Sequence, residues 1–128
     1  MRVAVACDGL EVALYFLHSS NFMIYTVERG KISGSRNMTT ADIPPAGYPD
    51  LLRTLEADTV IVGRIEYSVA EAMCRSGIEV VAGAQGTAGD VVRAYVNKTL
   101  SGVSEPCVVG EATSGSEFHV IGAQSQEA

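Results

Sequence analysis

Residues 59–63 read Thr-Val-Ile-Val-Gly, a continuous run of β-branched residues that ends at a glycine. Such a run lacks the alternation of a half-exposed strand and is typical of a strand buried on both faces of a sheet. Residues 66–76 follow with apolar side chains at helical spacing, and Gly77 is a suitable stop. Residues 78–82 are another apolar run. Strands joined by a helix are parallel neighbours, which predicts an α/β protein.

The N-terminal half predicts an antiparallel addition to this sheet. Residues 3–7 are a short apolar run, and residues 22–27 form a second run rich in β-forming residues. Residues 28–31, Glu-Arg-Gly-Lys, are typical of a hairpin turn into a shorter strand near residues 32–38. The segment from residue 10 to residue 18 fits either a loop or a short helix.

The remaining segments complete the expected architecture. Three prolines and a glycine mark residues 39–49 as a loop, and a helix is expected over residues 50–57. Residues 83–86 form another loop before a helix over residues 87–98, whose first residue is a threonine suited to capping. These elements predict a three-layer α/β/α sandwich with a mixed sheet of about five strands.

The charge is unevenly distributed and argues against two classes of partner. The 128 residues carry 9 Lys+Arg and 15 Asp+Glu, a formal net charge of −6. Residues 1–100 have a net charge of −2, and residues 101–128 hold four Glu and no basic residue, a net of −4. Because no basic stripe is present, neither nucleic acid nor a membrane surface is an expected partner.

The same numbers suggest how the chain is divided. One domain is expected over residues 1–100, and residues 101–128 are expected to be a flexible acidic tail rich in Ser and Gly, with a possible edge strand at residues 117–122. The sequence has neither an apolar run long enough to span a membrane nor a signal-peptide pattern, so a cytoplasmic location is expected.

Several polar and glycine residues follow directly after the predicted strands. In an open α/β sheet, ligands bind at the carboxyl ends of the strands. We therefore expect a binding site at this edge, and its candidate residues are Cys7, Asp8, Gly9, His18, Gly63, Arg64, Gly86 and Thr87.

Each candidate has a chemical and a structural interpretation. Cys7 could bind iron through its thiolate, or it could simply be a small buried residue that ends a strand. His18 could provide a second metal ligand. Asp8 could hold a metal or cap the turn, and Gly86 with Thr87 could receive an anion at a helix start or form a structural turn. Two ligands are too few for a closed cluster site, so a bound cluster would need ligands of its own or of a partner.

Catalytic motifs are missing from the sequence. Neither a dinucleotide fingerprint, a P-loop nor a Gly-x-Ser-x-Gly pattern is present. Glu11, Glu28 and Asp42 accompany Asp8, but not at a spacing recognisable for two-metal hydrolysis. A metal-dependent hydrolase that uses Asp8 is therefore only a third hypothesis, and the chain is not expected to be an enzyme.

Over about residues 2–100 the sequence resembles the dinitrogenase iron–molybdenum cofactor biosynthesis family, which includes NifX-like proteins and the C-terminal domain of NifB. The matching residues are Val3-Ala4-Val5, Asp8-Gly9, Val12, Phe16, Phe22, Ile24-Tyr25, Val60-Ile61-Val62-Gly63, Ala72, Gly77-Ile78, Gly83, Gly86-Thr87, Tyr95 and Leu100. The resemblance implies a ribonuclease H-like fold without nuclease activity. It also implies a nitrogen-fixation-related role in which iron–molybdenum cofactor, its precursor or a related metal–sulfur cluster is bound.

Two loops depart from the patterns that are common in this family. Where the family often has His-Phe-Gly-Arg, residues 15–18 are Tyr-Phe-Leu-His, and where it often has Gly-Gly-Ile-Gly, residues 63–66 are Gly-Arg-Ile-Glu. The first hypothesis is a small non-catalytic protein that binds or delivers an iron–molybdenum or iron–sulfur cofactor, with a possible protein partner in cluster assembly. The alternative is an interaction or regulatory module on the same fold that has lost cofactor binding.

Overall fold

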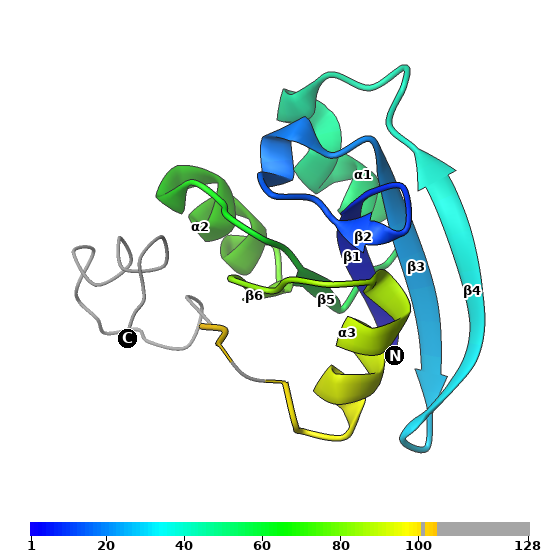
Figure 1. Ribbon diagram of the computed structural model, residues 1–128. Coiled ribbons are helices and arrows are strands. Elements are labelled where there is room, and N and C mark those ends of the chain that lie inside the picture. Colours follow the sequence, from blue (N-terminus) through cyan, green and yellow to red (C-terminus); the bar gives the residue numbers. More distant parts are fainter. Residues whose placement is uncertain (101, 105–128) are drawn as a thin grey trace.

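A mixed sheet of six strands organises the part of the chain that the computed structural model describes, residues 1–100 and 102–104 (Figure 1). In chain order the elements are β1 (Arg2–Asp8), β2 (Glu11–Val12), the 3₁₀ helix η1 (Phe16–His18), β3 (Asn21–Glu28), β4 (Lys31–Thr39), the 3₁₀ helix η2 (Pro45–Gly47), α1 (Tyr48–Thr54), β5 (Thr59–Ile61), α2 (Tyr67–Arg75), β6 (Glu79–Val81) and α3 (Ala88–Val96). The strand order is β4-β3-β1-β5-β6, and the two-residue β2 pairs with β1. The α/β class and the mixed sheet are confirmed, and β2 is the strand that the sequence did not indicate.

The strand β1 joins the two halves of the sheet. It runs antiparallel to β3, with Val3 opposite Tyr25, and parallel to β5, with Val3 beside Thr59. Residues 3–7 are all 0% exposed, because neighbouring strands flank β1 and side chains cover both of its faces. An apolar run without alternation is what such a position requires.

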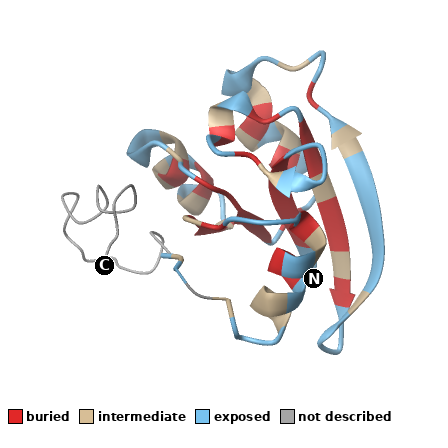
Figure 2. Cartoon of the chain, in the orientation of Figure 1, coloured by how far each residue is buried: buried red, intermediate tan, exposed pale blue. Residues whose placement is uncertain are grey.

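Helices cover both faces of the sheet, so the chain forms three layers (Figure 2). On one face, Leu52 of α1 and Met73 of α2 pack with Phe22 of β3 in one buried cluster. On the other face, Val92 of α3 packs with Val5 of β1 in a second cluster. The two clusters separate because successive side chains of a strand point to opposite faces.

The hairpin between β3 and β4 confirms the expected turn at residues 28–31. Arg29 and Gly30 both have positive φ, 55° and 76°, which is the geometry of a type I′ turn whose twist matches the flanking strands. The strand β4 is longer than expected and runs from Lys31 to Thr39, and its pairing with β3 has a register shift at Thr26/Val27 near the turn. Within the described residues, β4 is an edge strand, and most of its side chains are exposed.

Two other boundaries differ from the expectation. The helix α1 begins at Tyr48 rather than at residue 50, because Pro49 lies in the first turn, where its fixed φ suits a helix. It ends at Thr54, and Glu56 then adopts a positive φ of 59°, which breaks the helical path before residue 57. The undecided segment 10–18 contains both a short strand, β2, and a 3₁₀ helix, η1.

The beginning of the expected tail returns to the sheet. Ser104 and Ala82 exchange two backbone hydrogen bonds of 2.8 and 2.9 Å, which adds an isolated bridge beyond β6. Residues 101 and 105–128, with the possible strand at residues 117–122, lie outside the described residues. None of the helices in the described part is long and apolar enough to cross a membrane.

Candidate functional site

The carboxyl ends of β1, β5 and β6 meet at one edge of the sheet, and the segment of residues 11–16 crosses that edge. Val12 donates its N–H to the carbonyl of Gly86 at 2.9 Å, and Ala13 donates to the carbonyl of Ala6 at 2.9 Å. The predicted loops therefore lie close together, and residues 11–16 connect them through backbone hydrogen bonds. The carbonyls of Gly86 and Ala6 at this edge are therefore used for internal hydrogen bonds.

The role of Gly63 follows from this crossing. The N–H of Arg64 donates to the carbonyl of Leu14, and the carbonyl of Arg64 accepts from the N–H of Phe16, both at 2.8 Å. A Cβ at Gly63 would lie 2.4 Å from the carbonyl oxygen of Ala13 and 2.8 Å from that of Leu14. Gly63 is thus required for the close approach of another chain segment, which occupies the space where a side chain would lie.

The start of α3 is also engaged by the chain. Ala88 donates its N–H to the carbonyl of Leu10 at 2.8 Å, so this donor is not free for an anion. Thr87 is the N-cap residue, as predicted, although its side chain makes no hydrogen bond to the helix backbone. Hydrogen bonding from Arg93, and secondarily from Thr87, holds the pKa of Asp90 below its ordinary value.

Asp8 and Gly9 belong to the tight turn between β1 and β2. Gly9 has a positive φ of 76°, and the Asn21 side chain holds its backbone, accepting from the Gly9 N–H at 2.9 Å and donating to its carbonyl at 3.0 Å. Asp8 accepts a hydrogen bond from the Ser20 hydroxyl at 3.0 Å. Asn21 is not among the residues that the sequence indicated, and the only signal for it is a polar residue directly before an apolar run.

Cys7 lies in the buried cluster beneath α3 and is 0% exposed. Burial raises the pKa of its thiol to about 11, although a backbone hydrogen bond from Met23 acts weakly in the opposite direction. A neutral buried thiol is a poor ligand, because a metal binds the thiolate. The structural interpretation of Cys7 as a small residue that ends a strand agrees with this environment.

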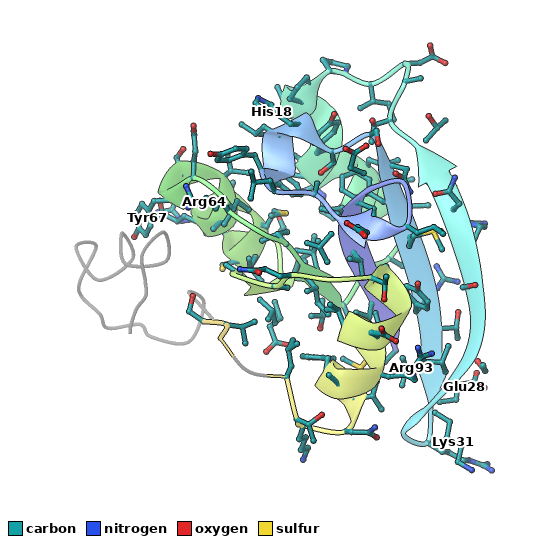
Figure 3. The ribbon with its side chains drawn as sticks, viewed as in Figure 1. His18, Glu28, Lys31, Arg64, Tyr67 and Arg93 are labelled. Carbon is teal, nitrogen blue, oxygen red and sulfur yellow. The ribbon has the colours of Figure 1, made fainter. Side chains whose placement is uncertain are left out.

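The exposed side of the crossing segment carries a group of polar and aromatic side chains. The His18 ring meets the Tyr15 ring edge to face at a centroid distance of 5.6 Å, and the guanidinium carbon of Arg64 lies 5.7 Å from the Tyr15 ring centroid. Figure 3 shows that His18, Arg64 and Tyr67 lie at the same end of the molecule. We call the set Leu14, Tyr15, His18, Arg64, Glu66 and Tyr67 the strand-end surface.

Arg64 differs from several other arginines in its charge environment. Arg53, Arg75 and Arg93 each pair with a carboxylate on the same helix. Within the described part of the chain, the Arg64 guanidinium forms no ion pair and lies over the Tyr15 ring instead. An exposed guanidinium held by an aromatic ring offers a fixed positive charge with several hydrogen-bond donors to an anion.

The two predicted metal ligands lie in different environments. Cys7 is buried beneath α3, whereas His18 is exposed on η1, whose Phe16 packs into the cluster on the opposite face of the sheet. In the described ranges no group of three or more His, Cys, Asp and Glu side chains is placed to hold a metal ion. The structure thus brings His18 together with Arg64, but not with Cys7.

These features define a small α/β protein whose strand-end loops present exposed side chains at the carboxyl edge of the sheet. The dinitrogenase iron–molybdenum cofactor family matches residues 1–98, and the chain belongs to this family. The family resemblance seen in the sequence is therefore confirmed. No curated protein sequence matches the chain significantly.

Solved structures support the same fold. The crystal structure of PH0822 has 23% sequence identity and a TM-score of 0.75, over 79% of this chain and 93% of that one. The apo form of the orange protein from Desulfovibrio gigas has 17% identity and a TM-score of 0.67, over 81% of this chain and 93% of that one. At these identities, the likeness establishes a shared fold.

We predict that Gly63→Ala lowers the free energy of unfolding by about 1–3 kcal/mol, because the new methyl group forces two backbone carbonyls to move. Urea denaturation followed by circular dichroism measures this change. Gly34→Ala is the matched control, since its Cβ meets no atom within 4 Å and its φ is not positive. Its effect is expected to stay within about 0.5 kcal/mol. Equal stability of the two variants would contradict the tight crossing at Gly63.

A second prediction concerns the buried thiol. Cys7 is expected to resist iodoacetamide in the native protein at pH 8 and to react once urea unfolds the chain, as read by peptide mass spectrometry. Burial raises its pKa from 9.0 to about 11, so the stability that the neutral thiol contributes is complete below pH 9 and is lost as the pH rises through 11. Cys7→Ala should lose less stability over this interval. Rapid native labelling of Cys7 would show that the site is open.

Proposed function

We propose that this chain is a non-catalytic protein that binds an anionic metal–sulfur cofactor as cargo on the strand-end surface. Membership of the dinitrogenase iron–molybdenum cofactor family supports this class of cargo. The observation that carries the choice of site is the Arg64 guanidinium, which is exposed, lacks an ion pair among the described residues and lies over Tyr15 beside His18.

The chemistry of the donors defines how such a cargo would be held. Arg64 supplies a positive charge and directional N–H donors to the sulfide or carboxylate groups of an anionic cluster. His18 supplies one imidazole nitrogen as a metal ligand. A single ligand leaves the remaining coordination positions to the cargo's own sulfides or to a partner, which suits transfer better than permanent storage.

Cys7 is left out of the proposed site, because its thiol is buried and held neutral. The remaining candidates contribute indirectly, because they shape the turns that carry the exposed side chains. These residues are Asp8, Gly9, Gly63, Gly86 and Thr87. We propose no catalytic step.

The test is anaerobic titration with isolated iron–molybdenum cofactor, followed by visible absorption and by the protein-bound metal after gel filtration. Arg64→Ala should weaken binding about tenfold, the loss expected for one charge-assisted contact. His18→Ala should shift the absorption spectrum, because a metal ligand is removed.

Arg36→Ala is the control, since Arg36 is exposed on β4 and also has no ion pair within the described residues. It should bind like the unaltered protein. Absence of binding by the unaltered protein, or equal losses in Arg36→Ala and Arg64→Ala, would overturn the proposed site.

A second candidate function is an interaction module that no longer carries cargo. The observation that favours it is the exposure of apolar side chains at the same edge, with Leu14 65% and Tyr67 49% exposed. The metal-free protein should then bind a protein partner, and its affinity for that partner should not change when the cofactor is added. Such a result would favour this function over cargo binding.

A further inference from the structure

Exposed apolar side chains are concentrated at the strand-end edge of the molecule. Among the described residues, five large hydrophobic side chains are exposed, and all but Met1 lie here, namely Leu10, Leu14, Tyr15 and Tyr67. The three that belong to the strand-end surface, Leu14, Tyr15 and Tyr67, are 65%, 42% and 49% exposed. Exposed apolar side chains at one edge, with polar groups beside them, are a feature of protein interaction surfaces.

The charges on this surface are complementary to one another. Arg64 and Glu66 are two residues apart, both are exposed, and neither forms an ion pair within the described part of the chain. They give the strand-end surface one positive and one negative charge, with no formal net charge when His18 is neutral. A partner surface of a single sign would satisfy one of these groups and repel the other.

We propose that a second copy of this chain docks on the strand-end surface through a two-fold symmetric interface. In such an interface the same patch meets itself, so Arg64 of one copy faces Glu66 of the other, and the pair occurs twice. The apolar side chains of the two copies then cover each other. One occupant therefore accounts for both the charge pattern and the exposed apolar groups.

The backbone prepares this surface for docking. The backbone N–H and carbonyl of Arg64 are both hydrogen-bonded to the crossing segment, and its guanidinium lies over the Tyr15 ring. Tyr67 is the first residue of the helix α2, and Glu66 is the N-cap residue directly before it. Groups that are already held in place lose little conformational freedom on association, which lowers its cost. The patch contains few large side chains, so we expect a weak dimer rather than an obligate one.

The test is sedimentation equilibrium of cargo-free protein, with a reductant present so that only non-covalent association is measured. Over loading concentrations from about 10 μM to about 500 μM, the range for a weak interface, the mass should rise from monomer towards dimer. Arg64→Glu and Glu66→Arg should each weaken association at least about tenfold, because each places two like-charged pairs across the interface. The double variant R64E/E66R should restore it.

Mixing the two single variants gives a sharper result. A mixed dimer of Arg64→Glu with Glu66→Arg has opposite charges at both contacts, so association should return on mixing although each variant alone stays monomeric. Arg36→Glu makes the same change of charge on the exposed strand β4 and should leave the dimer unaffected.

A monomeric mass for the unaltered protein at every concentration would overturn the proposal, as would a mixture that remains monomeric or a dimer insensitive to both single variants. Because no cofactor enters this experiment, its outcome is independent of cargo binding.

Discussion

The burial of β1 on both faces is the constraint on which the rest of the structure depends. Val3 and Val5 enter the cluster beneath α3, while Ala4 and Ala6 enter the cluster beneath α1 and α2. Each fully buried valine side chain of β1 stabilises the fold by roughly 1.5–3 kcal/mol. The same burial decides the chemistry of Cys7, because a thiol placed in this environment stays protonated and serves packing.

The crossing of the carboxyl edge by residues 11–16 has the largest consequence for function. Open α/β sheets present free loop backbone at this edge, and ligands occupy the space between the loops. Here Val12, Leu14 and Phe16 form hydrogen bonds to those loops or to the strand-end glycines, and the lack of a side chain at Gly63 lets the backbones meet. The functional site that we propose therefore consists of exposed side chains of the crossing segment and of the segment that leads into α2, rather than of backbone donors between the loops.

The crossing also explains how the structure accommodates the two loops that depart from the common family patterns. The side chains at positions 15, 18, 64 and 66 are exposed to solvent beside the crossing, whereas a side chain at Gly63 would meet the backbone carbonyls of Ala13 and Leu14. The proposed cargo site and the proposed self-association surface both use these residues. If both proposals hold, a cargo and a second copy would compete for Arg64.

The sequence by itself determined the α/β class, a buried strand at residues 3–7, the two-sided burial of residues 59–63, the hairpin at residues 28–31 and the family, because hydrophobic runs, turn residues and their order are local properties. Only the tertiary structure decided that residues 11–16 cross the strand ends, that Cys7 and His18 lie apart, and that Tyr15 and Arg64 meet. Those results depend on hydrogen bonds and contacts between segments some 50 residues apart, such as Tyr15 with Arg64, and no local pattern encodes such contacts.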